Sequence, residues 1–389
     1  GDVYKRQAQR LMSWIGSIPK TRSQALILGS VVSGALGYIH WGLGMMAAIV
    51  LGKEILAQSR KRGLGIHPPV MVAVLFMAFL TSSSGISGAA VLYSATPGYL
   101  RDLVPESYKE MTPETIGLTE SVLRIDFILF LVLCLAVTIV FAILMHPKRA
   151  EEIGQIDESV IEEYESSQQE IKISRGTPAE KANASRWIMY LIGGLGLIYS
   201  VNILVRDGIG ALNLNTFNFL FISLGMVLCA NYGPEFYAGL IRKGIDGTWG
   251  FILQFPIYAG ILGLISATGL GEVLTHFFTS ISTPTTWPMI AFLYSALLNI
   301  AVPSGGSKFV IEAPYLIPTT IDQGTDLGLI LQAYQMGDAT TNLLIPFFAL
   351  PYLANFKMKF SSIMGYTVPP VLVVMVMTCG YLLLKASLM

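Results

Sequence analysis

The stretch "NIAVPSGGSKFVIEAP", residues 299–314, lies between two apolar runs that are each too short to cross a bilayer, and it contains Lys308. A transmembrane helix needs about 20 apolar residues to span a hydrocarbon core of ~30 Å. Two shorter runs joined by Pro, Ser and Gly can instead enter the membrane, break and return. The stretch therefore predicts a re-entrant hairpin over residues 288–318, with a charged side chain near its tip.

The composition places the whole chain in a membrane. Of its 389 residues, 53% are hydrophobic and 13% are charged, whereas soluble domains contain about 25% charged residues. We therefore predict an all-α polytopic membrane protein. Its apolar segments lie near residues 25–40, 69–100, 121–145, 187–206, 216–231, 249–266, 288–318, 327–354 and 365–385.

The charges of the loops predict the topology, because Lys and Arg concentrate on the cytoplasmic side of a membrane. Residues 267–287 and 319–326 contain acidic residues but no Lys or Arg, so both ends of the 288–318 segment are predicted to lie outside. The basic residues that mark inside loops are Lys53, Arg60, Lys61, Arg62, Lys148, Arg149, Lys181, Arg186, Arg242, Lys243, Lys357 and Lys359.

The segment 69–100 gives conflicting signals. Residues 51–67 look cytoplasmic, whereas residues 101–120 contain two basic and five acidic residues and look external. The segment is therefore either a broken crossing helix or a second re-entrant hairpin. We favour a hairpin, because "SGIS" at residues 84–87 is similar to "SGGS" at residues 304–307.

Two pairs of motifs suggest a duplicated unit. "HWG" at residues 40–42 matches "NYG" at residues 231–233, and the two Ser-Gly motifs follow in the same order. Weak internal symmetry is typical of transporters built from inverted repeats. We predict a first transmembrane repeat over residues 1–145, a polar cytoplasmic connector over 146–186 and a second repeat over 187–389. The counterpart of the helix at 187–206 would begin before residue 1, so at least one further helix is expected upstream.

The Ser-Gly breaks are the strongest candidates for a binding site. Backbone N–H and C=O groups freed from a helix are costly in lipid unless protein, ligand or ions satisfy them. Glycine lets backbone amides approach a ligand closely, and the N-terminus of the following helix favours an anion such as a carboxylate. The alternative is close helix packing through small residues. The predicted substrate-binding residues are Ser84, Gly85, Ser87, Ser304, Gly305, Gly306, Ser307 and Lys308.

Lys308 needs a partner, because an unpaired ammonium is expensive inside a membrane. The partner is either a substrate carboxylate or Glu312, which follows one helical turn later.

A further break interrupts the 327–354 segment at "QMGDATTNLLIP", residues 335–346. There Asp338, Thr341 and Asn342 are predicted to bind a coupling ion, either H⁺ or Na⁺. Alternatively, Asp338 caps the following turn. The predicted periphery of the site consists of His40, Trp41, Asn231 and Tyr232.

Several function classes lack support in the sequence. The formal net charge is zero, so no nucleic-acid partner is expected. Cys134, Cys229 and Cys379 stand alone in apolar segments, without the spacing of a zinc site or a disulfide framework. Motifs of hydrolases, metalloproteases and phosphate-binding loops are absent from the sequence, which predicts no enzyme and no cofactor beyond Na⁺. His67 and His146 are expected to be solvated loop residues.

The motifs "HWGLG", "SGISGAAVLYSATPG", "ILQFPIYAGI", "SALLNIAVPSGGSKFVIEAPYLIP" and "GDATTNLLIPFFALP" resemble, in this order, the AtoE-type short-chain fatty acid transporters, and the similarity runs from about Pro19 to Leu384. The resemblance implies a secondary carrier of the bacterial inner membrane for short monocarboxylates such as butyrate or acetoacetate, with two inverted repeats and re-entrant hairpins. Related folds also make a homodimer an alternative to a monomer. The chain departs from the family pattern at Ser307, Lys308 and Phe309, where Gly or Gln followed by an aromatic residue is expected, so the substrate and the coupling ion stay open.

We therefore predict secondary active uptake of a small carboxylate from the membrane's outer side, coupled to H⁺ or Na⁺, with the Ser-Gly tips holding the carboxylate and Phe309 and Phe347 near its tail. One alternative is a carrier of dicarboxylates, amino-acid conjugates or peptides, for which Lys308 would supply a second cationic contact. An alternative of another class is a membrane sensor or scaffold, for which the breaks would be packing motifs.

Overall fold

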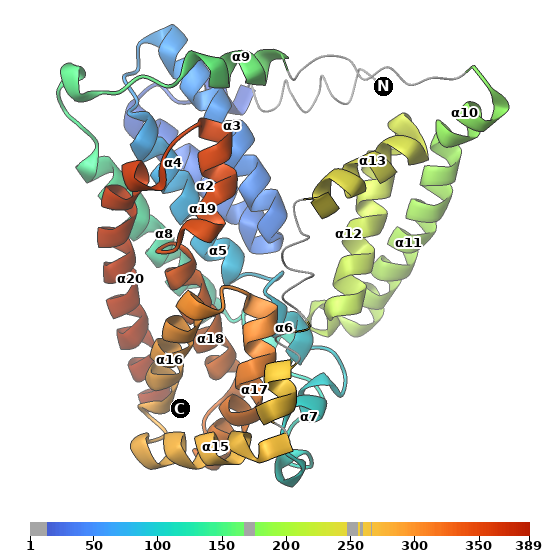
Figure 1. Ribbon diagram of the computed structural model, residues 1–389, viewed down its shortest axis with the longest axis vertical. Helices are drawn as coiled ribbons and strands as arrows, with labels where there is room; N and C mark the ends of the chain where they lie inside the picture. The colour runs from blue at the N-terminus through green and yellow to red at the C-terminus, as the bar shows by residue number, and fades with distance from the viewer. Residues whose placement is uncertain (1–13, 167–175, 247–255, 257–259, 266) are drawn as a thin grey trace.

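The computed structural model describes residues 14–166, 176–246, 256, 260–265 and 267–389. All secondary structure in this part of the chain is helical, which confirms the predicted all-α fold class (Figure 1). Most of the predicted apolar segment 249–266 lies outside the described residues. The elements up to the end of the first long crossing helix are α2 (Arg22–Ile39), α3 (Trp41–Arg62), α4 (Pro68–Met77), α5 (Phe79–Ser83), α6 (Ala89–Ser94), α7 (Tyr99–Leu103), η1 (Glu106–Tyr108), η2 (Leu118–Glu120) and α8 (Ile125–Met145).

The remaining helices follow the polar connector. They are η3 (Ala150–Glu152), α9 (Glu158–Ser166), α10 (Pro178–Asn183), α11 (Arg186–Asp207), η4 (Ile209–Ala211), α12 (Leu214–Leu228), η5 (Ala230–Tyr232), α13 (Gly233–Asp246), α15 (Leu270–Ile281), α16 (Trp287–Ala301), α17 (Gly305–Asp322), α18 (Leu327–Asn342), α19 (Pro346–Phe356) and α20 (Phe360–Leu388).

Helix α8 defines the direction across the membrane. Its most apolar 18-residue window has a mean hydropathy of 3.3, and its 21 residues span about 31 Å at 1.5 Å per residue, which matches a bilayer core. At its start, the Arg124 guanidinium lies 2.9 Å from the Asp326 carboxylate. Just beyond its end, the Pro147 carbonyl accepts a hydrogen bond from Arg22 at 3.2 Å. These contacts mark the two faces of the protein.

Basic loops gather at the Pro147 face. Arg60 pairs with Glu158 of α9, and Lys357 donates to Ser159 Oγ at 2.8 Å. Contacts of two acidic groups lie at the opposite face: Tyr108 donates to Asp322 at 2.8 Å, and Arg124 pairs with Asp326 at 2.9 Å. This distribution matches the loop-charge prediction, so the Pro147 face is the one predicted to be cytoplasmic.

Two helical hairpins enter from opposite faces. In the hairpin α2–α3, Arg22 at the start and Arg62 at the end both lie at the Pro147 face, where Arg62 donates to the Ser17 carbonyl at 2.6 Å. In the hairpin α16–α17, Trp287 at the start donates to Thr320 near the end at 2.9 Å. The Thr320 carbonyl in turn accepts from Thr325, next to the Asp326 face. Figure 1 shows the two hairpins approaching each other from the two ends of the molecule.

The segment 69–100 is a broken crossing helix, so the favoured hairpin was wrong. It begins at the Pro147 face, because the His67 N–H donates to His146 Nε2 at 2.9 Å. After the break at residues 84–88 it continues to the other face, where the Ser94 carbonyl accepts from Ile116 at 2.8 Å. The loop charges had indicated this crossing correctly. Similarity between "SGIS" and "SGGS" misled because any break in a membrane helix favours small hydroxyl residues.

The second half contains a matching broken helix. α18 starts at Asp326, breaks at residues 343–345 and continues as α19 to the Pro147 face. Each hairpin is thus followed by a broken crossing helix. By this order the hairpin tip at "HWG" has the same place as the tip at "PSGG", whereas the repeat with "HWG" paired to "NYG" stays a prediction. The motifs "HWG" and "NYG" are similar in sequence, and each lies at the start of a helix, α3 or α13.

Helices α11, α12 and α13 form a separate group on one side of the molecule (Figure 1). α11 packs on α12 through Gly193 and Gly196, whose positions leave room for Met226 and Ser223. Its other face exposes large apolar side chains, which suits contact with lipid. The apolar residues exposed along α11 include Trp187, Leu191, Ile192, Leu195, Ile198, Tyr199 and Val205.

His67 and His146 link the connector to the transmembrane helices, contrary to the expectation that both are solvated. His67 Nδ1 accepts from the Gly154 N–H at 3.0 Å. His146 Nε2 accepts from the His67 N–H, while its Nδ1 lies 2.8 Å from the Pro147 carbonyl. Each ring therefore needs one unprotonated nitrogen as an acceptor. Burial lowers the pKa of both imidazoles below the ordinary value; the neighbouring His146 disfavours protonation of His67 further, and Arg22 does so for His146.

We expect this link to weaken in acid. A lowered pKa contributes stability that is present above pH ~6.5 and is lost as the pH falls through the folded-state value, because the unfolded chain then binds more protons. The unfolding temperature in detergent should therefore drop more between pH 7.5 and 5 for the wild type than for the variant His67→Asn/His146→Gln, whose amide oxygens accept without titrating. His276→Asn, at an exposed position of α15, is the control. An equal drop in all three proteins would contradict the role of the link.

Candidate substrate and ion site

The two hairpin tips and the two helix breaks meet in the middle of the structure. The Trp41 N–H, at the tip of α2–α3, donates to Ser87 Oγ at 2.9 Å. The Ile86 N–H in the first break donates to the Tyr38 carbonyl at 2.8 Å. The Asn342 side chain at the end of α18 donates to Ser83 Oγ at 3.3 Å. Polar groups freed by one break are thus satisfied by another, as the lipid environment requires.

A cavity of about 400 Å³ lies where these four segments meet. Aromatic and small apolar side chains form much of its wall, and hydroxyl, amide and carboxylate groups are interspersed among them. This composition is typical of a small-ligand site. The cavity is lined by Trp41, Phe79, Ser82, Ser83, Ser87, Gly88, Ala89, Pro303, Ser304, Gly305, Gly306, Gln335, Asp338, Asn342 and Phe348.

The cavity includes part of the predicted substrate-binding set. Ser87, Ser304, Gly305 and Gly306 line it. Ser304 caps α17, because its Oγ accepts from the Ser307 N–H at 3.4 Å. The first N–H groups of α17 have no partner within the helix, and the helix starts at Gly305 and Gly306, which both line the cavity.

Ser84 and Gly85 do not line the cavity. Ser84 is buried, and its hydroxyl lies 3.5 Å from the Met336 sulfur. A Cβ at Gly85 would overlap the backbone carbonyl of Tyr38. The glycine is therefore needed for close packing between the first break and the α2–α3 tip, which was the alternative left open by the sequence.

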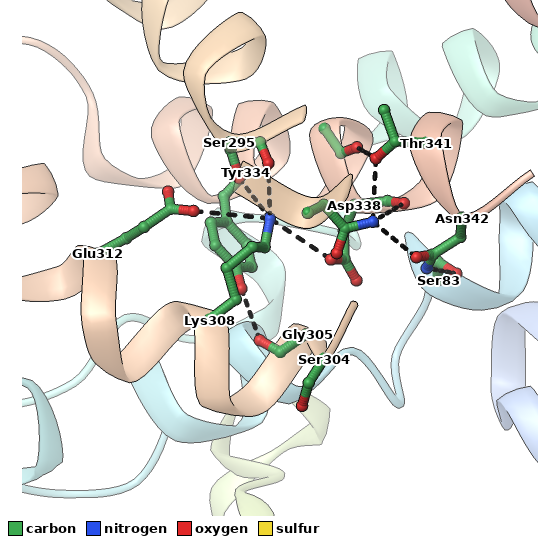
Figure 2. A network of polar contacts seen from close by, with 12 residues as sticks. Ser83, Ser295, Ser304, Gly305, Lys308, Glu312, Tyr334, Asp338, Thr341 and Asn342 are labelled. Atoms are coloured by element: carbon green, nitrogen blue, oxygen red, sulfur yellow. Dashed lines mark hydrogen bonds and ion pairs between the residues drawn. The ribbon is translucent and has the colours of Figure 1, made fainter. Parts of the chain in front are cut away.

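Lys308 lies behind the cavity wall rather than in it. Its side chain is 0% exposed. The Nζ atom lies 3.4 Å from Asp338 Oδ1 and 3.7 Å from Glu312 Oε1. It also donates to Ser295 Oγ at 2.6 Å and stands 4.1 Å from the centre of the Tyr334 ring (Figure 2). We call Lys308, Glu312 and Asp338 the Lys308 cluster.

In the Lys308 cluster the lysine contacts two carboxylates, Glu312 and Asp338. The predicted pairing with Glu312 at i,i+4 spacing is present, and Asp338 adds a second carboxylate from α18. Ser307 is likewise buried, at 8% exposure, outside the cavity lining. Within the predicted substrate-binding set, Ser307 and Lys308 are therefore buried outside the cavity lining.

Asn299 on α16 ties together the predicted ion-binding residues. Its Nδ2 donates to Asn342 Oδ1 at 2.7 Å, to Thr341 Oγ1 at 2.9 Å and to the Asp338 carbonyl at 3.3 Å. Thr341 Oγ1 also donates to the Gly337 carbonyl at 2.7 Å. Of the predicted set, Asp338 and Asn342 reach the cavity, whereas Thr341 is held inside this network.

Of the residues predicted at the periphery of the site, only part line the cavity. Trp41 lines the cavity. His40 instead packs against Phe217 and Phe221 of α12, with ring centroids at 5.5 and 4.5 Å. Asn231 and Tyr232 are in η5, which follows the C-terminal end of α12, and neither lines the cavity. The expected tail contacts Phe309 and Phe347 are also outside the lining, where Phe79 and Phe348 stand instead.

Opposed hairpins and broken helices around a central cavity are the construction of a membrane transporter. The particular family follows from comparison with known proteins. The family model described as "Short chain fatty acid transporter" matches residues 3–385. The chain belongs to this family, which consists of transporters and not of enzymes.

Two curated relatives carry the provisional name of a short-chain fatty acid transporter. The protein of Haemophilus influenzae is 31% identical over 92% of this chain and 78% of its own length. That of Escherichia coli is 31% identical over 93% of this chain and 78% of its own length. Among solved structures, the chain is similar to the YdaH transporter of Alcanivorax borkumensis, with a TM-score of 0.49 and 16% identity, over 96% of this chain and 83% of that one.

The close approach at Gly85 predicts a packing defect when a side chain is added. Gly85→Ala should destabilise the protein by about 1–3 kcal/mol, because the Cβ must displace the backbone of Tyr38. Gly365→Ala, in α20, is the matched control: no atom lies within 4 Å of its Cβ position. Unfolding in detergent by heat or denaturant measures both. Equal stability of the two variants would contradict the packing role of Gly85.

Proposed function

We propose that this protein is a secondary carrier that takes up short monocarboxylates such as butyrate or acetoacetate, together with a cation. The observation that carries the proposal is the central cavity between the two hairpin tips and the two broken helices. Central sites of this construction are typical of secondary transporters, in which alternating access exposes the site to each side in turn. Both curated relatives are bacterial proteins, which supports a place in the bacterial inner membrane.

A carboxylate would be recognised by N–H and O–H donors on one side of the cavity. Gln335 on α18 is 1% exposed and lines the cavity, and its Nε2 has no hydrogen-bond partner among the described residues. A buried amide without a partner costs about 1–3 kcal/mol unless a ligand satisfies it. The N-terminus of α17 at Gly305 and Gly306 adds further N–H groups and a favourable dipole.

The hydrocarbon tail would lie against the aromatic side of the cavity. The rings of Phe79 and Phe348 contact each other in a tilted arrangement with centroids 5.5 Å apart, and both line the cavity with Trp41 and Ala89. Burying a short alkyl chain there contributes roughly 0.8 kcal/mol per methylene group. This arrangement favours a monocarboxylate with a short apolar tail.

A dicarboxylate or a peptide fits the cavity less well. Its second charged group would need a fixed cation, and Lys308 was the candidate for that contact. The ammonium of Lys308 is buried between Glu312 and Asp338 and lies outside the cavity lining. These observations support the monocarboxylate.

A cation must accompany the substrate, because Asp338 lines the same cavity and would repel an incoming carboxylate. Either H⁺ or Na⁺ could compensate the charge. Thr341 and Asn342 were predicted to help bind this ion. Their side-chain oxygens already accept from Asn299, which leaves Asp338 as the main candidate.

Exchange of labelled butyrate in proteoliposomes tests the proposal without assuming a coupling ion. We expect vesicles loaded with unlabelled butyrate to take up external labelled butyrate. Gln335→Leu should raise the half-saturating concentration about 10- to 100-fold, since a hydrogen bond to a charged group contributes about 1.5–3 kcal/mol. Gln332→Leu, one turn away, is the matched control, because its amide is engaged with Ser121 and Tyr381 instead of the cavity. Absence of exchange by the wild type would contradict the proposed function.

A further inference from the structure

The Lys308 cluster contains more negative than positive charge. At the centre of the protein, the ammonium of Lys308 lies within 3.7 Å of an oxygen of each of the two carboxylates. Lys308 and Glu312 are 0% exposed and Asp338 is 6% exposed. If all three groups are ionised, the buried cluster has a net charge of −1, which is expensive at this depth of the membrane.

The surrounding side chains do not compensate this charge. α16 contributes Ser295 and Tyr294, α17 contributes Tyr315, and α18 contributes Tyr334. α6 approaches α17 with Tyr93, whose ring lies 6.5 Å from that of Phe309. These groups are hydroxyls and phenols, which are neutral at physiological pH. One proton bound to a carboxylate would make the cluster neutral.

The two carboxylates compete for the one ammonium. Lys308 Nζ lies 3.4 Å from Asp338 Oδ1 and 3.7 Å from Glu312 Oε1, and neither Asp338 Oδ1 nor the two Glu312 oxygens has a hydrogen-bond donor in suitable geometry. An ammonium at this distance favours the ionised form of whichever acid it contacts. If Lys308 pairs with Glu312, Asp338 is free to take a proton. A neutral Asp338 in the cavity wall no longer repels a carboxylate and can donate a hydrogen bond to it.

We propose that the Lys308 cluster is the proton-coupling element of the carrier, in which Asp338 takes up one proton with each carboxylate and Glu312 holds Lys308 while it does so. The proposal rests on the proposed function and names its coupling ion as H⁺. The proton binds to an Asp338 oxygen from the cavity, and no bond to the substrate is made or broken. Glu312 is a positioning residue, because it acts through Lys308 and does not line the cavity.

The pH dependence of butyrate exchange tests this role with two variants that shift it in opposite directions. In Glu312→Gln, Lys308 has only Asp338 as a charged partner and keeps it ionised. The pH of half-maximal exchange should then fall by about one unit or more, since an opposite charge at this distance shifts a titration by about 1–3 units. In Lys308→Met/Glu312→Gln, Asp338 is buried without an ammonium beside it. The pH of half-maximal exchange should therefore rise. Glu54→Gln, at a buried glutamate of α3 that contacts Gln58, is the control and should leave it unchanged.

Net accumulation under imposed gradients is the second readout. A proton gradient should drive butyrate accumulation in the wild type, and a sodium gradient at equal pH should not. Asp338→Asn should lose accumulation. A wild type that accumulates butyrate with sodium alone, or unshifted pH midpoints in both Glu312 variants, would overturn the proposal even though exchange still demonstrates a carrier.

A spectroscopic measurement keeps the test independent of butyrate. The infrared band of a protonated carboxyl group should appear in the purified wild type, without butyrate, as the pH is lowered through the midpoint of exchange. It should vanish in Glu312→Gln, where the single remaining acid pairs with Lys308, and persist in Glu54→Gln. A band that persists unchanged in Glu312→Gln, or is absent from the wild type, would contradict a shared proton in the cluster.

Discussion

The structure depends on one constraint: inside a hydrocarbon core, neither a backbone amide nor a charge can be left without a partner. In the described part of the chain, two hairpin tips and two helix breaks meet at the centre, and groups freed by one of them find partners in another. Trp41 bonds to Ser87, Asn342 bonds to Ser83, and Lys308 lies between two carboxylates. The cavity is a consequence of this arrangement, because breaks that satisfy one another cannot be packed as closely as continuous helices.

The same constraint connects stability with transport. Lys308 is needed to hold Glu312 and Asp338 in place, since removal of one partner from a buried ion pair is strongly destabilising. Its burial also removes it from the substrate, which explains how a lysine can follow the "PSGG" tip in a family where an uncharged residue is expected. In the proposed carrier the substrate meets amides, hydroxyls, aromatic rings and the Asp338 carboxyl group, while Lys308 and Glu312 lie one layer behind. A carrier for a small apolar anion suits this division.

Much of the fold follows from local patterns in the sequence, whereas the site depends on long-range contacts. The 288–318 hairpin was predictable because both flanking loops lack Lys and Arg, and Glu312 was predictable from its spacing to Lys308. The α2–α3 hairpin escaped notice because its tip at His40 to Gly42 has no Ser-Gly motif. Ser295 and Asn299 carried a signal, since a spacing of four places both on one face of α16. Their partners on α17 and α18 are distant in the chain, so no local pattern could identify them. Likewise, nothing local shows that Asp338 contacts Lys308, or that Asn231 and Tyr232 lie away from the cavity.

The most direct measurement is an experimental structure of the protein with 4-bromobutyrate, in which the bromine atom marks the end of the tail through its anomalous scattering. We expect one strong bromine peak between Phe79 and Phe348, with the carboxylate within hydrogen-bonding distance of Gln335 Nε2 and the start of α17. A fully occupied bromine site elsewhere, for example in the groove beside Arg60 and Gly154 near the connector, with an empty central cavity, would contradict the assignment of the cavity as the substrate site.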